Sequence, residues 1–191
     1  MIQQLPNLIT GGRLVLTVLL AVLLMFEQKT STALLCCLLF ALAASTDWVD
    51  GYLARRFGAV TTLGKLMDPL ADKLLVATAL IMLIPLHRIP AWVSLVILSR
   101  EMLVTGLRGA ASSSGIVVAA SGLGKIKSIV QYIGLGFLIF PLGLLPIPYL
   151  HQIGQGIVYI ALVLTVWSGL DYFYKLRRVF LDKEGQEGGK R

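Results

Sequence analysis

The sequence predicts an all-α membrane protein, a bundle of about six transmembrane helices with cytoplasmic N- and C-termini. Apolar residues of the AVILMFWYC set make up 57% of its 191 residues and charged residues only 14%, whereas soluble domains have roughly 45–50% and about 25%. The apolar residues gather into segments of about 20, the length that crosses a bilayer. No strand pattern of alternating polarity appears, and helices satisfy their own backbone hydrogen bonds in lipid.

The predicted spans are 8–26, 31–54, 66–86, 91–111, 127–145 and 150–173. Charged or proline-containing stretches separate them, such as Glu27 to Lys29 and Pro146 to Pro148. The first segment is interpreted as a span and not as a cleaved signal peptide, because it is long and lacks a small-x-small cleavage site. We therefore expect the chain to fold as one domain made of these helices.

The positive charges predict the orientation of these spans. With the N-terminus inside, only Lys29 and Arg88 of the 17 Lys and Arg residues fall on the outer side, in agreement with the positive-inside rule. Topology and anionic headgroups thus explain the net charge of +7, and we expect no nucleic-acid partner. Cys36 and Cys37 are adjacent in an apolar run, so we expect two small apolar side chains and neither a disulfide nor a zinc site.

Four of the ten acidic residues lie close together at the cytoplasmic ends of the second and third spans: Asp47, Asp50, Asp68 and Asp72. Placing a carboxylate within a membrane span costs free energy, so such residues usually have a function. Spacings of three and four place each pair on one face of a helix, and a loop of about ten residues makes the two helices antiparallel neighbours. The converging carboxylates would repel one another, and a hard divalent cation that prefers oxygen ligands would relieve that repulsion.

Small residues accompany these aspartates. Gly51, Ala54 and Gly64 fall on the same faces and leave room beside the carboxylates, and Arg55 lies one turn beyond Gly51. Small residues in membrane helices also serve close helix packing, but three of them on the carboxylate faces favour a ligand site. A guanidinium beside such a site suits phosphate oxygens.

This segment matches the pattern D-x2-D-G-x2-A-R-x8-G-x3-D-x3-D at every fixed position, and it resembles the CDP-alcohol phosphotransferase family. The eight matching residues are Asp47, Asp50, Gly51, Ala54, Arg55, Gly64, Asp68 and Asp72. The family is also built of six spans, so the resemblance covers nearly the whole chain. It implies a catalytic domain over 1–175 and a homodimer in the bacterial inner membrane whose active site faces the cytoplasm. The charged and finally Gly-rich composition after about Lys175 predicts a disordered cytoplasmic tail over 176–191.

The resemblance also implies roles for the individual residues. Two divalent ions, Mg²⁺ or Mn²⁺, would be held mainly by Asp47, Asp50 and Asp68. Asp72 would be the general base and would also lie close to the second ion. The donor, CDP-diacylglycerol, would bind with its tails in a groove that faces the membrane lipids. Its CDP head would contact Asp50, Gly51, Ala54, Arg55 and Gly64.

Looser motifs look like the phosphatidylglycerophosphate synthase branch of that family, whose acceptor is glycerol 3-phosphate. They run from Leu5 to Arg13, from Ser99 to Arg108 and from Gly124 to Lys127. A phosphorylated acceptor needs cations, and the candidates are Arg108, Lys125 and Lys127, joined by Arg13. Each could instead be a charge that sets the topology. Glu101, an acid within the fourth span, could pair with Arg100 or a cation on a neighbouring helix, or have a functional role.

Other functions stay open at this point. Within the family the acceptor could be phosphatidylglycerol, as in cardiolipin synthesis, or inositol phosphate or serine. Outside it, the chain could be a membrane cation transporter or a non-catalytic helical scaffold. A transporter predicts acids at mid-membrane depth, whereas these acids cluster near one face. A scaffold gives no reason for four aspartates at these spacings. Metal-dependent release of CMP would separate the enzyme from both.

Overall fold

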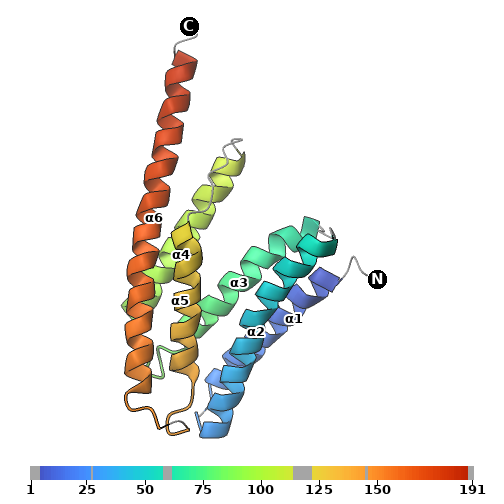
Figure 1. The fold of residues 1–191 in the computed structure, drawn as a ribbon, viewed down its shortest axis with the longest axis vertical. Helices are drawn as coiled ribbons and strands as arrows, with labels where there is room; N and C mark the ends of the chain where they lie inside the picture. The colour runs from blue at the N-terminus through green and yellow to red at the C-terminus, as the bar shows by residue number, and fades with distance from the viewer. Residues whose placement is uncertain (1–4, 27, 58–61, 114–121, 145, 189–191) are drawn as a thin grey trace.

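The computed structural model describes residues 5–26, 28–57, 62–113, 122–144 and 146–188, and it describes side chains for 10–26, 28–46, 70–71, 73–113, 124–144 and 146–177. Within this part the chain forms six helices and no strand (Figure 1). They are α1 (Leu5–Leu24), α2 (Thr30–Phe57), α3 (Thr62–Met82), α4 (Ala91–Ser113), α5 (Gly122–Ile139) and α6 (Leu150–Gly188). The prediction of an all-α fold with six helices is confirmed.

The helix ends differ from the predicted spans where prolines intervene. Helix α3 ends at Met82 and not at 86, and α5 ends at Ile139 and not at 145. Pro85 and Pro141 follow closely, and a proline disfavours helical geometry in the residue before it. These ends were misplaced because the apolar runs continue past the helices.

Helix α6 also departs from the prediction. The sequence predicts a disordered tail over 176–191, whereas α6 continues as a helix to Gly188. Residues 176–184 include good helix formers such as leucine, arginine and lysine, with no proline or glycine before Gly185. The pair Lys175 Nζ and Asp171 Oδ2, 2.7 Å apart at i,i+4 spacing, adds support just before this region. The division into a catalytic domain and a tail stays a prediction.

The helices form two groups of three (Figure 1). Helices α1, α2 and α3 pack together, and α4 and α5 both pack against α6. The two groups are joined by contacts of α3 with α4 and α5 and by contacts of α2 with α5. Helix α2 runs upward in the view and α3 returns downward, so the two are antiparallel, as the sequence predicts. The C-terminal half of α2, the N-terminal half of α3 and the start of α5 therefore lie at the same end of the bundle.

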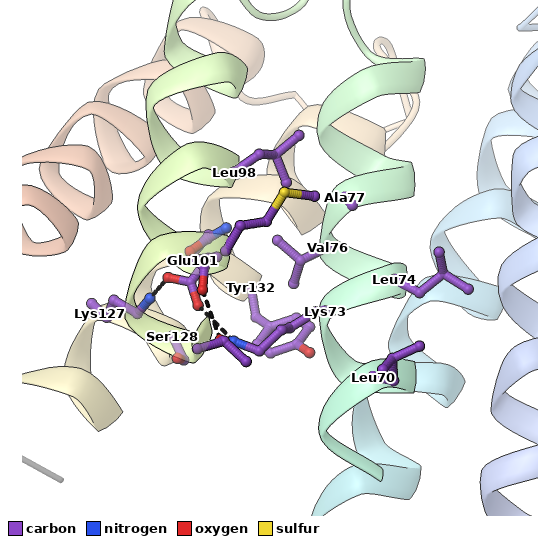
Figure 2. Close-up of a pocket in the computed structure, with 13 residues that line it drawn as sticks. Leu70, Lys73, Leu74, Val76, Ala77, Leu98, Glu101, Lys127, Ser128 and Tyr132 are labelled. Atoms are coloured by element: carbon purple, nitrogen blue, oxygen red, sulfur yellow. Dashed lines mark hydrogen bonds and ion pairs between the residues drawn. The ribbon is translucent and has the colours of Figure 1, made fainter. Parts of the chain in front are cut away.

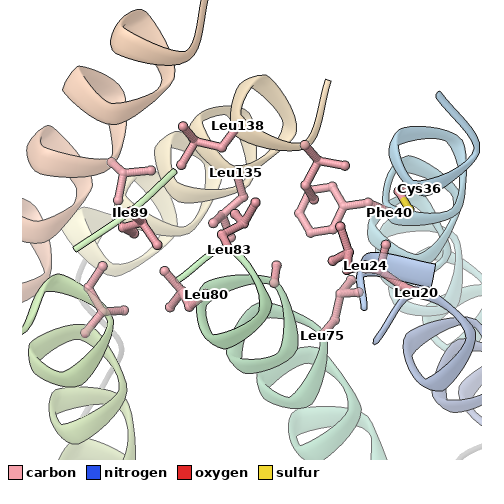
Figure 3. Packing of buried hydrophobic residues seen from close by; sticks show 14 of the residues in the cluster. Leu20, Leu24, Cys36, Phe40, Leu75, Leu80, Leu83, Ile89, Leu135 and Leu138 are labelled. Atoms are coloured by element: carbon pink, nitrogen blue, oxygen red, sulfur yellow. The ribbon is translucent and has the colours of Figure 1, made fainter. Parts of the chain in front are cut away.

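The buried core is apolar and draws side chains from every described helix. Leu20 and Leu24 of α1 lie close to Phe40 of α2, Leu75 of α3 lies beside them, and Leu80 lies on the other side of α3, toward Ile89 (Figure 3). The outer faces are apolar as well: Val15, Leu38, Leu103, Val163 and Trp167 are all more than half exposed. An apolar surface of this extent is typical of contact with lipid. Cys36 and Cys37 are free, as predicted.

The apolar stretches of these helices differ in length. In the described part of the chain, one segment, Leu150–Arg177, is long and apolar enough to cross a membrane. The apolar stretches Thr10–Leu24, Thr30–Thr46 and Lys73–Met82 are shorter. The six predicted segments are thus confirmed as helices, while their crossing of the membrane and the orientation of the termini stay predictions.

Helices α5 and α6 make the most extensive contact of the bundle, and two glycines allow it. A Cβ at Gly134 would lie 2.8 Å from Val158 Cγ2 and 3.1 Å from the Val158 backbone nitrogen. A Cβ at Gly154 would lie 3.0 Å from Phe137 Cβ. Small residues that let two backbones approach are the usual means of packing helices in membranes.

Arg88 caps the C-terminal end of α5, the end that lies away from the aspartates. Its Nη1 donates to the carbonyl oxygens of Leu138, at 2.7 Å, and Ile139, at 3.3 Å. These carbonyls belong to the last turn of the helix and have no partner within it. Gln155 Nε2 of α6 donates to the Arg88 carbonyl at 3.0 Å. Burial lowers the pKa of Arg88 from its ordinary value.

Candidate active site

The four predicted aspartates lie on the two antiparallel helices at one end of the bundle. Asp47 and Asp50 belong to the C-terminal half of α2, and Asp68 and Asp72 belong to the N-terminal half of α3. The two helices are in contact. The side chains of these aspartates, and those of Gly51, Ala54, Arg55 and Gly64, lie outside the described part of the chain. The backbone therefore agrees with the predicted arrangement, and the assignment of ligands and base stays a prediction.

Arg13 is anchored beside this aspartate region. It is 1% exposed, and its Nε donates to Thr46 Oγ1 of α2 at 3.2 Å, one residue before Asp47. Thr46 in turn donates to the Ala43 carbonyl at 2.7 Å, and Thr17 Oγ1 donates to the Arg13 carbonyl at 2.8 Å. A buried guanidinium held in this way supplies fixed positive charge beside the start of the acidic cluster.

A cavity of about 380 Å³ opens between α3, α4 and α5 (Figure 2). Its size falls in the range typical of small-molecule sites. Apolar side chains make up much of its wall, including Leu70, Val76 and Leu98. Its polar lining residues are Lys73, Glu101, Thr105, Lys127, Ser128, Gln131 and Tyr132. Because Lys73 directly follows Asp72, the cavity reaches the acidic segment of α3.

Glu101 is the centre of charge in this cavity. Its Oε1 lies 2.9 Å from Arg100 Nη1 and is also bonded to Lys127 Nζ, and its Oε2 lies 3.3 Å from Lys73 Nζ. Figure 2 shows Lys73 and Lys127 reaching the carboxylate from α3 and α5. The structural reading of Glu101, pairing with Arg100 or a cation on a neighbouring helix, is thus confirmed with both kinds of partner. With three cations and one carboxylate, these four side chains carry a formal charge of 3 − 1 = +2.

The acceptor-phosphate residues proposed from the sequence do not all lie at this cavity. Lys127, 4% exposed, lines it. Arg108 is exposed, and its guanidinium lies 5.5 Å from the ring centroid of Tyr172 of α6, a cation–π contact. Lys125 is exposed on α5, and Arg13 lies between α1 and α2. Their assignment to one acceptor pocket stays a prediction.

Lys73 and Gln131 are among the polar residues of the cavity that the sequence analysis missed. Lys73 was counted only as a charge that sets topology. Gln131 is 3% exposed and lies four residues after Lys127, on the same face of α5. A polar amide inside an apolar span was the available signal, since such a group is costly to bury without a partner.

A second, apolar groove of about 530 Å³ runs between α2 and α5. It extends from Ser45, two residues before Asp47, past Phe40 and Phe137 to Ile147 near the start of α6. Tyr132 lines both this groove and the cavity. Its ring also packs on Phe40, with centroids 5.9 Å apart. The cavity and the apolar groove thus meet at one side chain, that of Tyr132.

The comparison with protein families decides between the classes that remained open. A model of the CDP-alcohol phosphatidyltransferase family matches residues 3–167. The chain belongs to this family. The resemblance and the prediction of an enzyme are confirmed.

Individual relatives of this phosphatidyltransferase align over nearly their whole length. The CDP-diacylglycerol–glycerol-3-phosphate 3-phosphatidyltransferase of Bacillus subtilis is 40% identical over 90% of this chain and 94% of its own. The protein of the same name from Rickettsia felis is 38% identical over 93% and 98%. A probable phosphatidylglycerophosphate synthase of Mycobacterium tuberculosis is 36% identical over 93% and 83%.

The donor set of this phosphatidyltransferase suits a hard divalent metal ion. Four carboxylates lie on the contacting helices α2 and α3, and oxygen donors of this kind are preferred by Mg²⁺ and Mn²⁺. Among the residues whose side chains the structure describes, no other group of three or more His, Cys, Asp or Glu could hold a metal ion. The family assignment agrees with a divalent metal, while its identity and number stay predictions.

Proposed function

We propose that this phosphatidyltransferase moves the phosphatidyl group from CDP-diacylglycerol to glycerol 3-phosphate, releasing CMP and forming phosphatidylglycerol phosphate. The observation that carries the proposal is the similarity to relatives of that name across almost the whole chain. The cavity lined by Lys73 and Lys127 supports it, because a phosphomonoester needs cationic side chains and serine or phosphatidylglycerol would need them less.

In this proposal the aspartates have two different roles, metal binding and proton transfer. Asp47, Asp50 and Asp68 hold divalent ions, Mg²⁺ or Mn²⁺ and two per site, with Asp72 nearby. When bound, these ions neutralise the diphosphate charge and stabilise the leaving group. Arg55 pairs with phosphate oxygens, and Gly51, Ala54 and Gly64 leave room for the CDP head.

Asp72 acts as the general base. Its carboxylate takes the proton of the terminal hydroxyl of glycerol 3-phosphate as that oxygen attacks the β-phosphorus. A bond forms between the acceptor oxygen and phosphorus, and the bond from phosphorus to the bridging oxygen breaks. CMP leaves with that oxygen. The rest of the acceleration comes from positioning and charge neutralisation, as in other phosphoryl transfers.

The surroundings of the site support a membrane setting. We infer that the six helices span the bacterial inner membrane, with both termini and the aspartates on the cytoplasmic side and the lipid-facing surface made of exposed apolar side chains. The apolar groove between α2 and α5 begins at Ser45, two residues before Asp47 in the sequence, and suits an acyl chain of the donor. A homodimer is proposed from the family resemblance.

The test is release of CMP by the purified protein in detergent micelles. CDP-diacylglycerol and MgCl₂ are supplied with glycerol 3-phosphate, inositol phosphate, serine or phosphatidylglycerol in separate assays. We expect release with glycerol 3-phosphate alone, loss of release with a chelator, and recovery when Mg²⁺ or Mn²⁺ is restored. Release with another acceptor would retain the family chemistry and reject the proposed acceptor.

A substitution pair tests the base. Asp72→Asn removes the proton acceptor and should lower kcat by about 100-fold or more. Asp171→Asn is the matched control, because Asp171 is an aspartate of α6 that pairs with Lys175 at the surface. Equal activity of the two variants would remove Asp72 from the mechanism.

A further inference from the structure

Gln131 carries a hydrogen-bond donor that is unpaired within the described part of the protein. The residue is 3% exposed, and its Nε2 has no hydrogen-bond partner among the residues that the structure describes. Leaving such a donor buried and unpaired is unfavourable, and a native protein keeps one for a reason. Gln131 lines the cavity between α3, α4 and α5. Its Nε2 is itself buried, but the terminal torsion of a glutamine is broad, so a small turn of the amide brings this donor to a ligand in the cavity.

Several other polar groups of the cavity have bonding partners within the protein. Thr105 Oγ1 donates to the Glu101 carbonyl at 2.7 Å, and Ser128 Oγ donates to the Gly124 carbonyl at 3.2 Å. Lys73 and Lys127 are charged and bonded to Glu101. The cavity therefore holds a neutral amide donor as well as a pair of cations.

This pairing of groups matches the parts of a small polyol phosphate. Ammonium groups favour the charged phosphate, because charge-assisted hydrogen bonds are the stronger kind. One hydroxyl of glycerol 3-phosphate is consumed in the proposed reaction. The secondary hydroxyl is the remaining neutral oxygen, and a neutral amide N–H suits it.

We propose that Gln131 is a specificity-determining residue that donates a hydrogen bond to the secondary hydroxyl of the acceptor in the cavity between α3, α4 and α5. The inference rests on the proposed function and deepens it, because it names the secondary hydroxyl as the part of the acceptor that the cavity recognises. A site built around such a bond discriminates against an analogue that lacks the hydroxyl.

The experiment compares two acceptors in two proteins. Glycerol 3-phosphate and 3-hydroxypropyl phosphate, which lacks the secondary hydroxyl, are each supplied to the wild-type protein and to Gln131→Met. Methionine keeps the length of the side chain and removes the donor. The matched control is Gln152→Met, at an exposed glutamine of α6.

We expect Gln131→Met to lower kcat/KM for glycerol 3-phosphate by about tenfold, the effect of one hydrogen bond of ordinary strength. It should leave kcat/KM for 3-hydroxypropyl phosphate and KM for CDP-diacylglycerol unchanged. Its Tm should not fall, because the substitution removes an unpaired buried donor. A purely structural role predicts the opposite pattern, with a lower Tm and equal losses for both acceptors.

The outcomes separate the two proposals. Turnover of glycerol 3-phosphate by the wild-type protein together with an unaltered Gln131→Met variant would overturn the role of Gln131 and retain the proposed function. Equal losses with both acceptors would also overturn it. A wild-type protein that turns over only acceptors without a phosphate would overturn both.

Discussion

The close approach of α5 and α6 gives a quantitative prediction for Gly134. In Gly134→Ala the new methyl group would lie 2.8 Å from Val158 Cγ2 and 3.1 Å from the Val158 backbone nitrogen. The side chain can rotate away, but the backbone nitrogen belongs to α6 and cannot. Overpacking of this kind costs about 1–3 kcal/mol.

The matched control is Gly136→Ala, two residues further along the same helix. A Cβ at Gly136 would meet nothing within 4 Å. Both substitutions gain the same helix propensity, about 0.8–1 kcal/mol. The difference between the two variants therefore isolates the cost of overpacking.

The assay is thermal unfolding of both variants in the same detergent micelles. We expect Gly136→Ala to unfold above the wild-type protein and Gly134→Ala to unfold below Gly136→Ala. For a chain of this size the difference corresponds to about 2–12 °C. Gly154→Ala and Gly156→Ala repeat the comparison from α6, since a Cβ at Gly154 lies 3.0 Å from Phe137 Cβ and one at Gly156 meets nothing within 4 Å. Equal Tm values within each pair would refute the tight α5–α6 contact.

Two further predictions concern charge and capping. Glu101→Gln removes the carboxylate shared by Arg100 and the buried Lys127 and should destabilise the protein by about 3 kcal/mol. The control Asp171→Asn, at the surface, should cost at most about 1 kcal/mol. Comparable Tm values for the two variants would contradict the central place of Glu101. Arg88→Met leaves the α5 carbonyls of Leu138 and Ile139 without their donor and should cost about 1–3 kcal/mol in the same assay. An unchanged Tm would show that these carbonyls find other donors.

The helices and the acidic pattern could be predicted from the sequence because both depend on local spacing. Apolar runs of about 20 residues mark the helices, and spacings of three and four place Asp47 with Asp50 and Asp68 with Asp72 on helix faces. The antiparallel pairing of α2 and α3 follows from the short connection between them. Helix ends near Pro85 and Pro141 were less accurate, because the apolar run outlasts the helix.

The cavity could not be predicted, since it depends on which distant helices become neighbours. Lys73 of α3, Glu101 of α4 and Gln131 of α5 meet only because α3 packs against both α4 and α5. Nothing in the local spacing of Gln131 indicates that contact. Arg108 shows the reverse case: its sequence position suggested a phosphate ligand, and the structure places it over the ring of Tyr172.

The glycine contacts between α5 and α6 also determine where the molecule can deform. The backbones of α5 and α6 come so close at Gly134 and Gly154 that no side chain fits between them, and their contact is the most extensive in the bundle. We therefore expect this helical hairpin to move as one rigid unit. Both the cavity and the apolar groove have α5 as a wall. If the cavity or the groove widens to admit a substrate, we therefore expect α2, α3 or α4 to move relative to the α5–α6 hairpin, because their contacts are less extensive.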